Sequence, residues 1–475
     1  MADIVPKQLF PAEIEMVEEI KLDEPPSYGR EDEARIVRKI DARLMPTTAL
    51  IYLLCYIDRG NIGNAKILNA DEGDAMPQTN HMTNYQFTIA LMVFIVAYCV
   101  FEAPSNLALK VLTPNRWLGF LVFSFGAICC GIAGTTNFAG VVGLRFLLGA
   151  CEAGIFPGMV FFMSFWYKPE ERATRIAVFL CSATLAGAFG GAIAYGVGHM
   201  NHAGGLVAWR WLFIIEGLPS VIVGILVFFF MPNYPENAGW LTEAEKSIQR
   251  QRLSAGNSSH GEAKINWADA KATLKDVKLW VHYSTYFAAG SGATSLSLFS
   301  PVIVAGLGYH GLRAQLFTVP PYAVAYVVTL VVALWSDNRR MRGLFACAAF
   351  TTASISFLIL AAIPGTHYAV RYFFLIVATS GCFSALPPLC AWVGDNGRST
   401  TAGSLATALN IASSGPGQII GVWIYRAQDK PLYQLGHGVN AGFQLIGACV
   451  TLGLYLHYKK LNRRLAGTNA TRWIA

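Results

Sequence analysis

The sequence predicts an all-α integral membrane protein whose twelve transmembrane helices form two six-helix bundles. Of its 475 residues, 54% are hydrophobic and only 14% are charged, whereas globular proteins carry about 25% charged residues. Hydrophobic runs of about 18 residues or more recur along the chain, and each is long enough to cross a hydrocarbon core of ~30 Å. A polar segment at 233–279 separates the first six runs from the last six.

The twelve runs define the spans and domains that we expect. We place the spans at about 44–66, 84–109, 116–134, 140–166, 173–198, 209–231, 280–305, 315–335, 343–364, 369–393, 400–425 and 438–458. The expected domains are a cytosolic tail at 1–43, a six-helix bundle at 44–232, a cytosolic linker at 233–279, a second six-helix bundle at 280–458 and a cytosolic tail at 459–475.

Charges in the loops predict the orientation of the chain. Basic residues such as Lys110, Arg172 and Arg339 gather after even-numbered spans, whereas the loop after the first span carries Asp71 and Asp74. Because short cytosolic loops are enriched in Lys and Arg, we expect a multi-pass protein of the plasma membrane with both termini in the cytosol. The net charge of +7 reflects this topology, and no nucleic-acid partner is expected.

The linker at 233–279 is expected to hold two short helices. Thr242 and Glu245 have the spacing of a capping box at a helix start, and 267–278 has the pattern of a second, amphipathic helix. A linker of this kind allows two halves to rock against each other.

Four ionisable residues inside apolar spans are the candidate functional residues. Asp58 and Arg59 are adjacent in the first span, and Arg145 and Glu152 lie in the fourth, seven residues apart and therefore on one helix face. A charge at the membrane centre costs at least ~2.5–3.5 kcal/mol on insertion scales, so such residues usually mark a substrate or ion pathway. We expect structural or gating roles for a third acid, Glu216.

The chemistry of these residues predicts a coupling mechanism. Arginine keeps its charge, so a buried arginine needs an anion at all times, which Asp58 and Glu152 can supply in the empty protein. A carboxylate substrate would bind Arg59 or Arg145 at two points, and the displaced acid would then take up a proton. The alternative is a pair of static ion pairs that fix helix packing.

Four segments resemble a known family. They are YIDRGNIGNA at 56–65, LRFLLGACEAG at 144–154, WRWLFIIEG at 209–217 and the stretch from Pro235 to Thr242. In this order they resemble the anion:cation symporter branch of the major facilitator superfamily, especially the fungal allantoate and nicotinate permeases. The resemblance covers about residues 30–460 and implies the major facilitator fold.

The resemblance also implies roles for individual residues. Arg59 and Arg145 would bind the anion, and Asp58 and Glu152 would carry the proton. Further substrate contacts would come from Tyr98, Asn410 and Tyr56. Gating residues would be Asp337, Arg339 and Arg340 after the eighth span, and Asn106 after the second, where the family usually has an acidic residue.

The leading functional expectation is proton-coupled symport of a small organic anion, such as a vitamin- or nitrogen-source-like carboxylate, by a monomer that needs no cofactor besides the coupling proton. Two alternatives stay open. One is an exporter of an anionic or amphipathic metabolite on the same fold, and the other is a membrane sensor that binds without transporting. The sequence contains no nucleophile elbow and no metal-ligand spacing, so neither an enzyme nor a metal site is expected.

Overall fold

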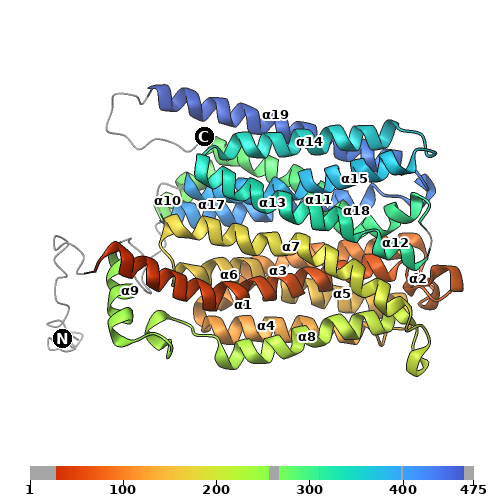
Figure 1. The fold of residues 1–475 in the computed structure, drawn as a ribbon, viewed down its shortest axis with the longest axis horizontal. Coiled ribbons are helices and arrows are strands. Elements are labelled where there is room, and N and C mark those ends of the chain that lie inside the picture. The colour runs from red at the N-terminus through yellow and green to blue at the C-terminus, as the bar shows by residue number, and fades with distance from the viewer. Residues whose placement is uncertain (1–27, 256–266, 310, 397–399, 465–475) are drawn as a thin grey trace, which may run out of the picture.

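The computed structural model describes residues 28–255, 267–309, 311–396 and 400–464, and these residues form only helices, turns and loops (Figure 1). Eleven of the described helices, or helix pairs, are long and apolar enough to cross a membrane. The remaining predicted span, 400–425, is divided into two shorter helices. The all-helical fold predicted from the sequence is therefore confirmed.

The helices follow the predicted spans in order. The first half contains α1 (Arg30–Ala65), α2 (Met76–Thr79), α3 (Asn84–Val111), α4 (Pro114–Ile132), α5 (Phe138–Glu152), α6 (Ile155–Ser164), α7 (Pro169–Gly198) and α8 (Ala208–Phe230). The linker contains α9 (Glu243–Ala255) and α10 (Trp267–Lys275). The second half contains α11 (Val277–Gly306), α12 (Leu312–Leu316), α13 (Val319–Arg339), α14 (Arg342–Ala362), α15 (Tyr368–Ser384), α16 (Leu386–Asp395), α17 (Thr400–Ala412), α18 (Ser414–Trp423) and α19 (Gln434–Arg464).

Three of the spans are broken near their middle, and proline explains each break. The spans divide into α5 and α6, α15 and α16, and α17 and α18. A proline follows the end of each first piece within five residues: Pro157 after Glu152, Pro388 after Ser384 and Pro416 after Ala412. Proline lacks the N–H that a helix needs and its ring clashes with the carbonyl four residues earlier, so the helix cannot continue straight through.

The two halves pack separately and meet along a limited set of helices. In Figure 1 the first half lies below and the second half above, with α7 beside α13 where they meet. Within the first half, α4 packs on α8 and α1 on α7; within the second, α14 packs on α19 and α11 on α18. The halves contact each other mainly through α7 with α12, α13 and α16, α1 with α11, and α3 with α18.

Close helix approach depends on glycine at the contact between α3 and α5. A Cβ atom on Gly149 would lie 2.3 Å from the carbonyl oxygen of Phe94, so no larger residue fits without moving a backbone. Helices in lipid associate through such small-residue contacts because packing replaces the hydrophobic driving force. This contact places α5, which carries Arg145 and Glu152, directly against the α3 surface that carries Phe94.

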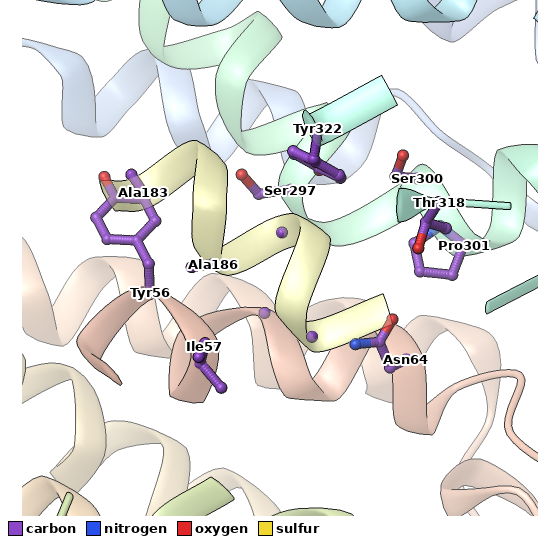
Figure 2. Close-up of a pocket in the computed structure, with 13 residues that line it drawn as sticks. Tyr56, Ile57, Asn64, Ala183, Ala186, Ser297, Ser300, Pro301, Thr318 and Tyr322 are labelled. Atoms are coloured by element: carbon purple, nitrogen blue, oxygen red, sulfur yellow. The ribbon is translucent and has the colours of Figure 1, made fainter. Parts of the chain in front are cut away.

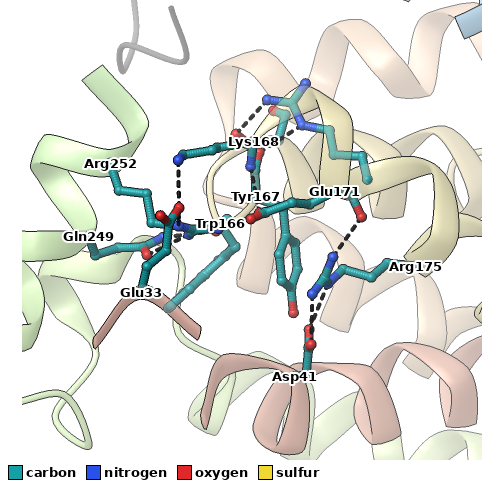
Figure 3. A network of polar contacts seen from close by, with 11 residues as sticks. Glu33, Asp41, Trp166, Tyr167, Lys168, Glu171, Arg175, Gln249 and Arg252 are labelled. Carbon is teal, nitrogen blue, oxygen red and sulfur yellow. Dashed lines mark hydrogen bonds and ion pairs between the residues drawn. The ribbon is translucent and has the colours of Figure 1, made fainter. Parts of the chain in front are cut away.

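The first helix begins at Arg30, well before the start expected near residue 44, and its polar extension binds the linker helix α9 (Figure 3). Arg252 of α9 is fully buried; its Nε lies 3.0 Å from Oε1 of Glu33, and its Nη2 pairs with the carboxylate of Glu171. Gln249 accepts a hydrogen bond from Arg252 Nη1 (2.8 Å) and donates one to the Trp166 carbonyl (2.8 Å). The extension is therefore helical because α9 covers it.

Two further contacts hold the linker to the first half. The rings of Trp240 and Trp166 stack with centroids 5.8 Å apart and planes 11° apart. Lys39 and Glu245 form an ion pair at 2.7 Å, and this pairing lowers the pKa of Glu245 below its usual value. The contacts of α9 thus attach it to the first half, whereas α10 lies against α17 of the second half.

Candidate functional site

A cavity of about 80 Å³ lies between the two halves and is lined by residues of both. The first half contributes Tyr52, Tyr56, Phe94, Tyr98 and Phe156, and the second contributes Tyr286 and Phe383. Among the described residues, the charged side chains in its wall are those of Arg59 and Arg145. The cavity has room for several water molecules, and its wall combines aromatic surface with positive charge.

Arg145 is a buried residue of this wall with unsatisfied hydrogen-bond donors among the described residues. Its side chain is 1% exposed, and neither Nε nor Nη1 has a hydrogen-bond partner among the described residues. Its guanidinium carbon lies 4.7 Å from the ring centroid of Phe94. A cation–π contact offsets only part of the cost of burying a charge, so an anion in the cavity would complete the site.

Arg59 is held by one acid and by an aromatic cage. Its Nη2 and Nε each lie 3.2 Å from Oε2 of Glu152. Its guanidinium carbon lies 4.8 Å from the ring centroids of both Tyr56 and Tyr98. Of the two cavity arginines, Arg59 therefore has an acid partner, and Arg145 has none among the described residues.

Glu152, which the sequence places on the same helix face as Arg145, pairs with Arg59. Its fully buried carboxylate forms an ion pair with Arg59 of α1 and also accepts a contact from the Cys55 thiol at 3.5 Å. The static Arg145–Glu152 ion pair that the sequence left open as an alternative is absent from the described contacts.

Asp58 points away from the cavity although it is adjacent to Arg59. Oδ1 of Asp58 accepts a contact from the Cys129 thiol at 3.3 Å, and Oδ2 accepts a hydrogen bond from the Ser220 hydroxyl at 3.1 Å. Successive residues on a helix point about 100° apart, so one of the pair faces the cavity and the other faces α4 and α8.

Of the other predicted substrate contacts, two line the cavity and one does not. Tyr56 and Tyr98 line the cavity. Asn410 is not in its wall; it is buried in α17, and neither its side-chain oxygen nor its nitrogen has a partner among the described residues. The sequence prediction did not include Tyr52 and Phe94, because aromatic residues in an apolar span carry no signal that separates a cavity wall from ordinary packing.

A second cavity of about 30 Å³ shares Tyr56 and Ser297 with the first (Figure 2). Its wall comes from α1, α7, α11 and α13, and its polar side chains include Asn64 and Thr318, which lie at the outer ends of their spans in the predicted topology. Polar surface therefore continues from the first cavity toward the outer face.

One of the predicted gating residues joins the two halves. Asp337 at the end of α13 accepts a hydrogen bond from the Thr174 hydroxyl of α7 at 2.6 Å, and it also pairs with Arg342, which binds Asp395 at 2.6 Å. Arg339 and Arg340 are exposed, and the side chain of Asn106 lies outside the part that the structure describes. Arg342, which the sequence prediction left out, links the acidic residues of this cluster.

Within the described residues, one group of side chains has the composition of a metal site. Atoms of Glu72, Asp74 and His202 lie within 4.8 Å of one another in loops between spans. The Asn201 amide already donates to Glu72 at 2.6 Å and to Asp74 at 2.8 Å, so protein donors satisfy part of this acidic group.

The sequence also matches a family model. The model of the Major Facilitator Superfamily matches residues 48–422. This chain belongs to the major facilitator superfamily. As a member of that superfamily it is a multi-pass membrane transporter and not an enzyme, as the sequence predicted.

Two relatives match this superfamily member over most of their length. The MFS transporter prlL of Fungal sp. (strain NRRL 50135) is 52% identical over 431 residues, which cover 90% of this chain and 87% of the relative. The high-affinity nicotinic acid transporter of Saccharomyces cerevisiae is 30% identical over 438 residues, which cover 92% and 80% of the two chains. The predicted relationship to fungal transporters of this superfamily is confirmed.

A solved structure shares the superfamily fold. It is a bacterial homologue of the human lysosomal transporter Spinster in an inward-facing and unoccupied conformation, with a TM-score of 0.61 and 15% identity, covering 91% of this chain and 99% of that one. At this identity the likeness establishes the fold.

Proposed function

We propose that this transporter moves a small organic anion together with protons by alternating access between its two halves. The observation that carries the proposal is Arg145, a buried guanidinium at the cavity wall with two nitrogen atoms that lack a partner among the described residues. A carboxylate matches the planar fork of arginine at two points, and it supplies the negative charge that the site lacks.

The wall of the cavity supports a carboxylate with a small apolar or aromatic body. Tyr52, Phe94 and Tyr286 present rings to the same space that Arg145 faces, and ring faces pack well against flat apolar groups. The yeast relative named as a nicotinic acid transporter supports a carboxylate substrate for this chain.

The coupling proton depends on Arg59, because this arginine can pair either with Glu152 or with the substrate carboxylate. In the structure Arg59 pairs with Glu152 at 3.2 Å. A substrate carboxylate that binds Arg59 removes this partner from Glu152, and a buried carboxylate without a partner is stabilised by taking up a proton. Substrate and proton then cross as a neutral set, and release of the substrate restores the Arg59–Glu152 pair.

Proton-driven symport implies uptake, and we propose that the protein works as a monomer in the plasma membrane with both termini in the cytosol. The Thr174–Asp337 contact at 2.6 Å joins the halves at the end of the bundle where α9 and α10 lie. Opening the cavity at this end would require the contact to break, which gives Asp337 its proposed gating role.

The experiment that tests this proposal is a thermal-shift screen of the purified protein with carboxylates, each paired with its amide, for example nicotinate and nicotinamide. At least one carboxylate should raise Tm while its amide does not, and Arg145→Lys should remove the shift. Equal stabilisation by a carboxylate and by its amide would show that the site does not select anions.

A further inference from the structure

We propose that Glu216 of α8 and Asp58 of α1 form a two-carboxyl proton site inside the first half, separate from the substrate cavity, that exchanges protons with Glu152. The inference rests on the proposed proton coupling and adds a third acid to it. Glu216 has no role in the chemistry derived from Arg59, Arg145 and Glu152, and the sequence suggested only a structural or gating role for it.

Glu216 lacks the partners that a buried carboxylate needs. Its side chain is 2% exposed, and neither Oε1 nor Oε2 has a hydrogen-bond partner among the described residues. No ion pair with a described Lys, Arg or His includes it. An ionised carboxylate in such a place costs several kcal/mol, whereas a protonated one carries no charge. The surroundings of Glu216 therefore favour a bound proton.

The neighbour that makes this a site is Asp58. It is fully buried, and it contacts α8 at Ser220, one helical turn after Glu216 on the same face. Its contacts are the neutral donors Cys129 and Ser220, at 3.3 and 3.1 Å, and no described cation is within ion-pair distance of it. Two neighbouring carboxyl groups without a cation do not both ionise, so the pair holds at least one proton.

The groups around Glu216 and Asp58 leave one route for a proton, from Glu216 through Asp58 toward the cavity. The helices packed on α8 are α4, α1 and α7; α4 brings the thiols of Cys129 and Cys130, and α7 carries its charged residues only in its first two turns. From α5, Glu152 contacts Cys55 and Arg59 of α1, which lie three residues before and one residue after Asp58. Asp58 is thus the group between Glu216 and the acid of the cavity.

The proton balance of this arrangement is simple. A proton that leaves the Glu216 carboxyl for the Asp58 carboxylate leaves one carboxylate behind, and the same holds for the next transfer from Asp58 to Glu152. Neither Asp58 nor Glu216 lines the cavity, so substrate does not touch them. Glu216 is therefore a positioning residue for the proton, and it acts on transport through Asp58.

The test combines infrared difference spectroscopy of the purified protein during a pH titration with uptake measured against pH. Glu216→Gln should remove one band of a protonated carboxylic acid, and it should shift the pH midpoint of uptake to lower pH by about one unit, because Asp58 loses a like-charged neighbour. Counterflow exchange of substrate should persist. Cys130→Ser, a change on the α4 surface that faces the same part of α8, is the control for packing and should leave both readouts unchanged.

An unchanged carboxylic band and an unchanged pH midpoint in Glu216→Gln would overturn the inference. If that variant cannot be purified, Glu216→Asp keeps the acid, and its band should move; a band at the wild-type position would equally count against the site. The infrared titration needs no substrate, so it still decides the inference if wild-type uptake proves indifferent to the proton gradient and the proposed function fails.

Discussion

At the scale of single residues, the two arginines of the cavity have different partners and therefore different roles. Arg59 shares Glu152 and lies between two tyrosine rings, so its charge is balanced before substrate arrives. Arg145 has a single ring contact and two unpaired nitrogen atoms among the described residues. Substrate binding should therefore depend most strongly on Arg145, and coupling on the acid that Arg59 releases.

Arg145→Lys tests this division. Lysine keeps the charge but lacks the planar fork, so the variant loses a charged hydrogen bond of about 1.5–3 kcal/mol, which corresponds to roughly 10- to 100-fold weaker apparent affinity in uptake. Arg313→Lys on α12 is the matched control. Near-normal affinity of Arg145→Lys at equal surface expression would remove Arg145 from the binding site.

The sequence was sufficient to find the charged residues but not their partners. Asp58, Arg59, Arg145 and Glu152 stand out because charge is rare in apolar spans. Whether Glu152 meets Arg59 or Arg145 depends on how α1 and α5 are rotated about their axes, and that rotation is set by packing such as the Gly149 contact with α3. Asn410 is buried in α17 and is not among the residues of the cavity wall, and its position depends in the same way on the rotation of α17.

At the scale of elements, the helix α9 behaves as part of the first half. Its contacts are with α1 and with the segment that joins α6 to α7, through Arg252, Gln249 and Glu245. The sequence predicted the capping box at Thr242 and Glu245, and both of its hydrogen bonds are present at 2.9 and 3.3 Å. It did not predict the helical extension of α1, because residues 30–43 are polar and become helical against a partner far along the chain.

Arg252→Ala should release α9 from the first half. The change removes the guanidinium that links Glu33 and Glu171 to α9. Both carboxylates are partly exposed and Glu33 keeps its ion pair with Lys168, so the loss is that of a hydrogen bond to a charged group, about 1.5–3 kcal/mol. Hydrogen exchange of the α9 amides should become faster by at least tenfold. Lys246→Ala on the same helix, which removes an ion pair with exposed Glu243, is the control; equal exchange in both variants would show that the buried cluster does not hold α9.

The Lys39–Glu245 pair predicts how α9 responds to pH. The pKa of Glu245 is below its usual value of 4.5, so the pair contributes stability above that pH, and the contribution is lost as pH falls through the lowered value. Amide protection of α9 should therefore stay constant between about pH 8 and pH 5 and decline only at lower pH. Lys39→Ala should reduce this decline but not abolish it, because Glu33, whose pKa is lowered by Lys168 and Arg252, still loses its pairing with α9 in acid. A decline centred near neutral pH would contradict the assignment.

At the scale of the whole molecule, alternating access requires the halves to separate at one face and close at the other. At the outer face α7 lies directly on α12 and α13: a Cβ atom on Gly191 would be 2.1 Å from the Thr318 hydroxyl oxygen. The Gln315 amide of α12 also donates to the Asn64 carbonyl at 3.0 Å. In the structure this face is therefore closed by close packing of α7 on α12 and α13 and by the hydrogen bond between α12 and α1.

Gly191→Val should prevent that closure. The added atoms collide with Thr318, so the outer ends of α7 and α13 should be farther apart, and the protein should favour an outward-open state with reduced net uptake. Gly196→Ala on the same helix has no atom within 4 Å of its new Cβ and serves as the control. Distances between spin labels on the outer ends of the two helices measure the effect, and an unchanged distance distribution in Gly191→Val would refute it.

The measurement that tests the central claim most directly is proton influx driven by the anion itself. Proteoliposomes loaded with a pH-sensitive dye and held without a pH gradient should acidify inside when a transported carboxylate is added outside. Glu152→Gln should abolish the acidification while counterflow exchange of the same carboxylate persists, because the amide imitates the protonated acid but moves no proton. Uptake of the carboxylate by the wild-type protein without any acidification would contradict proton-coupled symport.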